Sequence, residues 1–244
     1  MNGLLAAGRL VRLVPHVLHG LWIVKRRFVQ LTSAEKHQRI QWWSAKTLRL
    51  LGITLTCHGR PLAGGHLVVA NHVSWLDIAA VHAVLPQARF VSKSDVKHWP
   101  LVGALVEGVG TLFIERTSKR DALRVVHQTA AALQAGDCVA VFPEGTTGAG
   151  SALLPFHANL LQAAVSTQAP VLPLVLRWHE PGQPFSVAAQ FIGDTTLVQS
   201  LWRIAAARGL CVDVQVLPVV PSPGQDRRAL AEALHGLISA RLPR

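Results

Sequence analysis

The stretch Val69-Ala70-Asn71-His72-Val73-Ser74-Trp75-Leu76-Asp77 organises the rest of this sequence. The residues that lead into it, Leu67–Ala70, are apolar and include two valines, which predicts a buried strand, whereas the apolar spacing from Trp75 to Val84 predicts a helix. His72 therefore lies where a strand gives way to a helix. Such a place holds a side chain rigidly and leaves it within reach of a ligand.

His72 and Asp77 have the chemistry of an acid–base pair. An imidazole can take a proton near neutral pH, and a neighbouring carboxylate can hold its tautomer and stabilise the imidazolium. Residues five apart do not share a helix face, so a turn must separate the two, and Ser74 is predicted to cap a helix that carries Asp77 in its first turn. The alternative is that His72 is simply one of the twelve histidines, without a catalytic role. Asp77 would then be an acid at a helix start, where the helix dipole favours a negative charge. The spacing alone leaves both interpretations open.

Three further blocks follow in order: Gly110-Thr111-Leu112-Phe113-Ile114-Glu115-Arg116, Phe142-Pro143-Glu144-Gly145-Thr146-Thr147 and Val171-Leu172-Pro173-Leu174. With the first stretch they resemble the glycerolipid acyltransferase family, which includes the lysophosphatidic acid acyltransferases. The resemblance implies an α/β fold with a mostly parallel sheet flanked by helices. It also implies transfer of a fatty acyl group from acyl-CoA or acyl carrier protein to the free hydroxyl of a lysolipid, foremost 1-acylglycerol-3-phosphate, giving phosphatidic acid.

The resemblance also assigns roles to individual residues. His72 would deprotonate the acceptor hydroxyl and Asp77 would orient the imidazole, without a covalent acyl-enzyme. The residues implied in substrate binding are Asn71, Lys93, Arg116, Glu144, Gly145 and Thr146. Arg116 would contact the acceptor's phosphate, which a guanidinium suits as a bidentate donor, and Asn71 would hold His72 or stabilise the turn. No metal or cofactor is implied beyond the acyl thioester, because no His, Cys and Asp cluster has ligand spacing.

Thr147 departs from the family pattern, because lysophosphatidic acid acyltransferases commonly carry an arginine at this position. One cation fewer favours an acceptor other than a phosphate monoester, for example lyso-ornithine lipid. Arg116 and Lys93 still offer cations suited to phosphate, which favours lysophosphatidic acid. The sequence leaves the acceptor open between these two lipids.

The composition is both apolar and basic. Half of the 244 residues are hydrophobic and 15% are charged, yet the net charge is +11. Anionic lipid headgroups account for this combination, whereas nucleic-acid binding is not expected, since there is no zinc-ligand spacing and no aromatic-basic strand. We expect a monotopic protein on the cytoplasmic face of the inner or plasma membrane. The acidic surface of acyl carrier protein would also suit a basic partner.

The N-terminal residues 1–52 are predicted to form an amphipathic membrane-attachment segment, and residues 53–244 the α/β acyltransferase domain. A spanning helix needs about 20 mainly apolar residues, and residues 3–31 are interrupted by Arg9, Arg12, His16 and His19. We expect a helix in the interface with its arginines snorkelling, and a short spanning helix is the alternative. A second helix from Ser33 to Leu51 would end at Gly52 and would pack on the core or on lipid.

Strands and helices alternate through the remainder, which predicts a mostly parallel sheet covered on both faces. Strands are expected at residues 53–57, 67–70, 89–92, 111–114, 138–142, 171–176, 186–192 and 212–217. Helices are expected at residues 75–84, 101–106, 121–135, 156–166 and 227–242.

Two competing functions belong to other classes. One is a non-catalytic, basic membrane-surface binding protein that has kept the fold, against which the intact Asn71, His72 and Asp77 count. The other is a hydrolase that uses the same pair with water as the acceptor.

Overall fold

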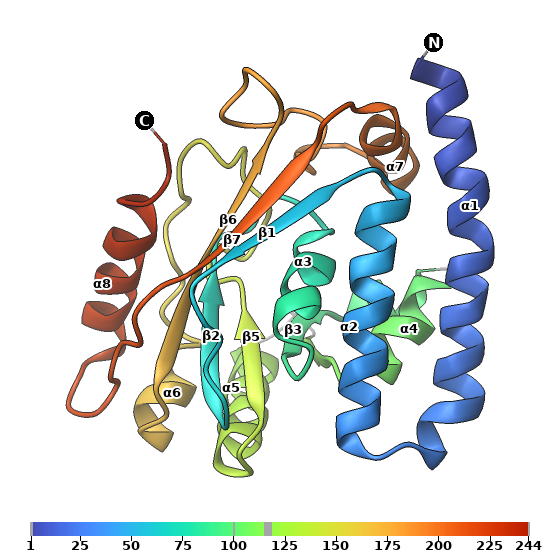
Figure 1. Cartoon of the computed structure of the whole chain (residues 1–244). Coiled ribbons are helices and arrows are strands. Elements are labelled where there is room, and N and C mark those ends of the chain that lie inside the picture. The colour runs from blue at the N-terminus through green and yellow to red at the C-terminus, as the bar shows by residue number, and fades with distance from the viewer. Residues whose placement is uncertain (1, 100, 115–118, 244) are drawn as a thin grey trace.

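The computed structural model describes residues 2–99, 101–114 and 119–243. Within them the strands form one sheet in the order β1-β7-β6-β2-β5-β3-β4, shown in Figure 1. Neighbouring strands run parallel except β6 and β7, which are antiparallel. The strands are β1 Thr54–His58, β2 His66–Ala70, β3 Arg89–Lys93, β4 Leu112–Ile114, β5 Cys138–Val141, β6 Val171–His179 and β7 Cys211–Val216. The prediction of a mostly parallel α/β sheet is confirmed.

Helices cover both faces of this sheet (Figure 1). One core contains residues of α1, α2, α3 and α7, and the other contains residues of α5, α6 and α8. The helices are α1 Asn2–Trp22, α2 Ser33–Leu50, α3 Asp77–Val84, α4 Val102–Gly108, α5 Lys119–Gln134, α6 Gln162–Thr167, α7 Leu197–Ala206 and α8 Arg227–Ser239. The central strand β2 alternates between the cores, with Leu67 and Val69 in one and Val68 and Ala70 in the other. This two-sided burial explains why its sequence is continuously apolar.

The carboxyl ends of β2, β5, β3 and β4 meet at one edge of the sheet because these strands are parallel. The blocks that begin at Asn71, Phe142 and Lys93 follow three of these ends. Segments far apart in the chain, such as those that begin at Asn71 and Phe142, are thereby brought to the same edge. Ligand sites in parallel sheets commonly lie there.

The two N-terminal helices lie side by side at one end of the molecule (Figure 1). Thr32 and Glu35 form a capping box at the start of α2, and Gly52, with a φ of 76°, follows its end. The Arg9 guanidinium on α1 donates from Nη1 to the carbonyl oxygens of Ala205 and Ala207, at 2.9 and 2.6 Å. The expectation that the arginines of this helix snorkel is therefore wrong for Arg9, which binds the end of α7.

The outer side of α1 is apolar. Five of its large apolar residues are at least half exposed, and their spacing places them in one stripe along the helix. These residues, named here the outer stripe, are Leu4, Val11, Val14, Leu18 and Trp22. His16, by contrast, is buried and its ring stacks on Trp43 at 5.1 Å between centroids. The inward side of α1 thus combines His16 with apolar residues such as Leu13, whereas Arg12 of the same helix is exposed. Among the residues described, no helix has the length and hydropathy needed to cross a bilayer.

Two expectations about local structure were wrong, and one helix was not expected. Residues 186–192 form turns instead of a strand, because Ser186 Oγ accepts the N–H of Ala189 at 3.2 Å and holds the backbone in a turn. The helix expected from Phe156 begins only at Gln162, and α7 was not foreseen.

Candidate active site

His72 and Asp77 form a direct pair at the carboxyl end of β2. Nδ1 of His72 lies 2.8 Å from Oδ2 of Asp77, and the imidazole retains 19% of its side-chain exposure. A carboxylate oxygen can only accept a hydrogen bond, so Nδ1 of the neutral imidazole carries the proton and Nε2 carries the lone pair. This arrangement presents a proton acceptor at a partly open position, as acid–base chemistry requires.

The carboxylate of Asp77 is fully buried and surrounded by donors. Besides His72, Oδ2 accepts the backbone N–H groups of Val73 at 2.7 Å and Ser74 at 2.9 Å. The other oxygen, Oδ1, accepts the indole N–H of Trp178 at 2.6 Å. These bonds offset the cost of burying a charged group.

Ser74 does not cap α3 as expected. The residue before the helix is Leu76, and no side chain caps the helix there. Ser74 instead contributes its backbone N–H to Asp77, and its hydroxyl accepts the N–H of Leu76 at 3.3 Å. The turn that the spacing required is therefore closed by the aspartate side chain, which takes the place of a serine cap.

The backbone of His72 is held on both sides. Its N–H donates to Oε1 of Glu144 at 2.7 Å, and its carbonyl accepts the N–H of Gly148 at 2.7 Å. The imidazole stacks on Phe142, with 4.0 Å between ring centroids and 7° between planes. The loop after β5 thus fixes both the backbone and the ring orientation of His72.

Glu144 acts as a clamp between loops. It is only 4% exposed; Oε1 accepts from His72, and Oε2 accepts the backbone N–H of Leu154 at 2.8 Å. Burial raises the pKa of Glu144 above its ordinary value, and the two N–H donors oppose that effect. The resemblance implied substrate binding for Glu144, whereas in this structure both of its oxygens bond to backbone.

The next residues of this loop differ in their surroundings. Gly145 has a φ of 70°, a conformation that glycine adopts without strain, and its N–H donates to Phe142 at 3.0 Å. Thr146 is exposed. Thr147, which stands where the family commonly has arginine, donates its hydroxyl proton to the carbonyl of Phe191. The side chain at this position thus binds protein backbone.

Asn71 is buried beside β6, one of the two strands that neighbour β2 in the sheet. Its Nδ2 donates to the carbonyl of Leu176 at 2.9 Å, and its Oδ1 accepts the N–H of Leu176 at 2.7 Å. The amide thereby continues the pairing of β2 with β6 by one residue. This contact fixes the point at which the chain leaves the sheet, immediately before His72.

Lys93 is the last residue of β3 and is exposed. Its strand neighbours β5, whose following loop carries Glu144, so Lys93 lies at the same edge of the sheet as the His72 pair. Arg116 lies outside the residues that the structure describes.

Sequence reasoning missed two parts of the site. Trp178 lies 101 residues after Asp77 and bonds to it. Residues 186–192 wrap over the site loops, since Phe191 N–H donates to Val73 at 3.0 Å and Gln190 donates to Ala149 at 2.9 Å. No local pattern signals these long-range contacts.

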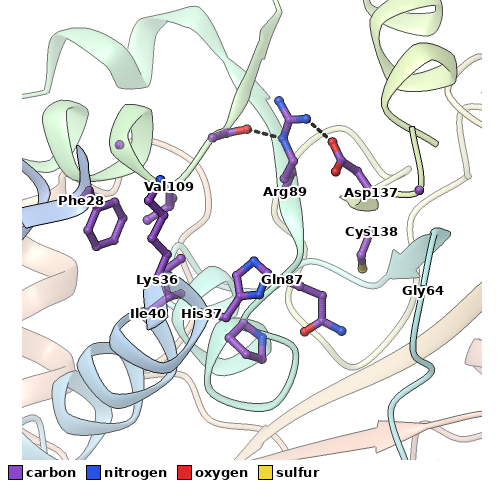
Figure 2. Close-up of a pocket in the computed structure, with 14 residues that line it drawn as sticks. Phe28, Lys36, His37, Ile40, Gly64, Gln87, Arg89, Val109, Asp137 and Cys138 are labelled. Atoms are coloured by element: carbon purple, nitrogen blue, oxygen red, sulfur yellow. Dashed lines mark hydrogen bonds and ion pairs between the residues drawn. The ribbon is translucent and has the colours of Figure 1, made fainter. Parts of the chain in front are cut away.

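A separate cavity of about 410 Å³ lies away from this site (Figure 2). It is lined by residues at the starts of strands, such as Gly64 and Arg89, and by Lys36 and His37 of α2. Arg89 there pairs with Asp137, as Figure 2 shows. The cavity thus adjoins the edge of the sheet opposite to His72.

Comparisons with known proteins found a matching family, similar sequences and a similar fold. The model of the acyltransferase family matches residues 54–177. The lyso-ornithine lipid O-acyltransferase of Pseudomonas aeruginosa is 37% identical over 232 residues, covering 93% of this chain and 88% of that protein. The 1-acyl-sn-glycerol-3-phosphate acyltransferase of Neisseria gonorrhoeae is 39% identical over 187 residues, covering 75% of this chain and 72% of that protein. In fold, the chain is similar to the crystal structure of the 1-acyl-sn-glycerophosphate acyltransferase PlsC from Thermotoga maritima, with a TM-score of 0.68, 19% identity and 96% of each chain covered.

Proposed function

This chain belongs to the acyltransferase family and is an O-acyltransferase that acts on a lysolipid, and we propose that its acceptor is 1-acylglycerol-3-phosphate, which it converts into phosphatidic acid. The observation that carries the acyl-transfer chemistry is the buried, fully bonded Asp77 beside a partly open His72. An acyltransferase needs a positioned base more than a nucleophile of its own, because the acceptor supplies the hydroxyl.

In the proposed mechanism, Nε2 of His72 takes the proton of the acceptor hydroxyl as its oxygen attacks the thioester carbonyl. The tetrahedral intermediate then collapses, the carbon–sulfur bond breaks, and the imidazolium returns the proton to the departing thiolate. Asp77 holds the ring and stabilises the imidazolium between these two steps. We propose acyl-CoA or acyl carrier protein as the donor of the thioester.

The proposed phosphate acceptor is supported by Lys93 at this edge of the sheet and, in the sequence, by Arg116. Lys93 is exposed at the end of β3, and Arg116 follows β4 by two residues. An ammonium and a guanidinium together suit a phosphate monoester.

A second acceptor, lyso-ornithine lipid, is favoured by one contact. Thr147 bonds to Phe191 at the position where an arginine is expected, so this position adds no cation for a phosphate. The relative from Pseudomonas aeruginosa, which matches most of this chain, is named for that lipid.

We further propose that the protein binds the surface of an anionic membrane through the outer stripe of α1. The exposed apolar residues of this helix support the proposal, because a bilayer surface would cover them, and the cationic Arg12 is exposed on the same helix. Three cations, Lys25, Arg26 and Arg27, follow immediately after the helix and would meet anionic headgroups, each contributing about 1 kcal/mol near the surface.

The test of the reaction is an acyl-transfer assay of the purified protein in detergent. Radiolabelled acyl-CoA and acyl carrier protein thioesters are offered to 1-acylglycerol-3-phosphate and to lyso-ornithine lipid in parallel. Product from the first acceptor supports the proposal, and product from the second alone replaces it with the second candidate. Free fatty acid formed without any lysolipid would identify a hydrolase, and no turnover with either acceptor would favour the binding-protein alternative.

The role of His72 is tested with a matched pair of variants. His72→Ala is expected to abolish transfer, whereas His127→Ala, on the exposed side of α5, is expected to leave it unchanged. Turnover retained in folded His72→Ala would refute the mechanism.

Membrane binding is tested by sedimentation with vesicles that contain phosphatidylglycerol. Leu18→Glu is expected to weaken binding, because it places a charge within the outer stripe. Leu123→Glu introduces the same charge at a 61% exposed leucine on the other face of the sheet and should have no effect. Equal binding by both variants would remove the outer stripe from the membrane contact.

A further inference from the structure

We infer that Trp178 is a positioning residue for the acyl-transfer reaction, holding the Asp77 carboxylate at the angle from which it orients His72. The inference rests on the function proposed above. Trp178 lies on β6, is 2% exposed, and its indole N–H reaches Oδ1 of Asp77 at 2.6 Å.

The two oxygens of Asp77 are held by different parts of the chain. Oδ2 accepts three donors from its own loop, namely His72 Nδ1 and the N–H groups of Val73 and Ser74. Oδ1 accepts the indole N–H, and within the described residues no second donor to this oxygen is recorded. The loop contacts alone fix Oδ2 and would still allow the carboxylate to rotate about that oxygen. The indole fixes the second oxygen, and the two oxygens together with Cγ define the plane of the carboxylate.

The position of the indole is itself rigid. Trp178 follows Leu176 on the same side of β6, and the backbone of Leu176 is bonded to Asn71, the residue before His72. The carbonyl of Trp178 also accepts the N–H of Ser186 at 2.8 Å. One strand thus fixes both where the chain leaves β2 and how the carboxylate is oriented.

A tryptophan that merely fills the core would explain the burial, so the experiment must separate its volume from its donor. Trp178→Phe keeps a six-membered ring and loses the N–H. Trp178→His loses more volume but keeps a donor, since the five-membered rings of histidine and indole superpose with Nε2 near Nε1. Trp75→Phe is the matched control, because the indole of Trp75 donates instead to Ser200 on α7 at 3.1 Å.

We expect Trp178→Phe to lower kcat about tenfold to a hundredfold per folded enzyme with both KM values unchanged, the size expected for losing one bond to a charged group. Trp178→His should retain more kcat than Trp178→Phe although it leaves the larger void, and Trp75→Phe should stay within about twofold of the wild type. A lower kcat in Trp178→His than in Trp178→Phe would overturn the inference, as would an unchanged kcat in Trp178→Phe. Folded fractions are measured by thermal unfolding.

If neither Trp178 variant folds, the bond can be tested by NMR spectroscopy of a protein that keeps Trp178. With all seven tryptophans labelled with ¹⁵N, one indole N–H resonance should lie far downfield in the wild type and move upfield in Asp77→Asn. Identical indole spectra for the two proteins would overturn the inference. The acyl-transfer assay of the wild type tests the proposed function separately. An inactive wild type would refute that function, whereas the indole spectra would still show whether Trp178 bonds to Asp77.

Discussion

Replacing Glu144 by glutamine tests whether this residue serves the loops or the substrate. Both carboxylate oxygens accept backbone N–H groups, from His72 at 2.7 Å and from Leu154 at 2.8 Å. A glutamine side chain has one acceptor oxygen, so its amide group must face one of these N–H donors. One backbone N–H beside this buried side chain is left without its carboxylate partner whichever way the amide turns.

The size of the effect follows from this count. Leaving one buried donor unsatisfied costs about 1–3 kcal/mol, and Glu144 is only 4% exposed, so water does not restore the bond. For a chain of this length, 2 kcal/mol corresponds to a fall in Tm of about 4–8 °C. We also expect kcat to fall, because one of the two donors belongs to His72, whereas the acceptor KM should stay within about twofold.

Thermal unfolding in detergent and steady-state kinetics measure the two effects. Glu107→Gln is the matched control, since Glu107 pairs with Lys97 at the surface, where both side chains are about half exposed, and its loss should cost under about 0.5 kcal/mol. An unchanged Tm together with a strongly raised acceptor KM would refute the clamp and make Glu144 a substrate ligand.

Three further perturbations have definite expected outcomes. Burial lowers the pKa of His82 to about 4, below its value in the unfolded chain. As the pH falls, the unfolded state therefore takes up the proton first, and the free energy of unfolding should fall by about 3 kcal/mol between about pH 6.5 and pH 4. His82→Gln should flatten this pH dependence in thermal unfolding, and an equally steep curve would contradict the explanation. Arg9→Ala removes the bonds from α1 to α7 and should cost about 1–2 kcal/mol in thermal unfolding, so an unchanged Tm would show that this contact is not stabilising. Thr147→Arg restores a cation and should raise kcat/KM for lysophosphatidic acid relative to lyso-ornithine lipid by about tenfold; an unchanged ratio would remove position 147 from acceptor selection.

Local sequence predicted those parts of the fold that depend on local patterns. The run Leu67–Ala70 was recognisable as a strand because both of its sides face apolar cores. The pairing of His72 with Asp77 was predictable because the two residue types and the required turn lie within one short stretch. The geometry of that turn was not predictable, since Asp77 bonds to the backbone of Ser74 and the serine hydroxyl does not cap the helix.

The remaining features depend on partners far away in the chain. Nothing near Trp178 indicates that its indole meets Asp77, and nothing near Glu144 indicates that its oxygens bond to His72 and Leu154. Residues 186–192 carry a strand-like composition, but their backbone bonds to the loops around Val73 and within the segment itself. Tertiary contacts override local propensity in such segments.

The pairing of β7 with the first strand of the chain has a consequence for folding during synthesis. The edge strand β1 pairs with β7, and Thr54 meets Cys211 more than 150 residues later in the chain. At a synthesis rate of about 5–20 residues per second, β1 waits roughly 8–30 s on the ribosome before its partner exists. The inward side of α1 waits longer still, because Arg9 binds the end of α7, which follows 196 to 198 residues later. The N-terminal helices therefore emerge well before the sheet closes, and the last strand to be translated completes the packing of the first.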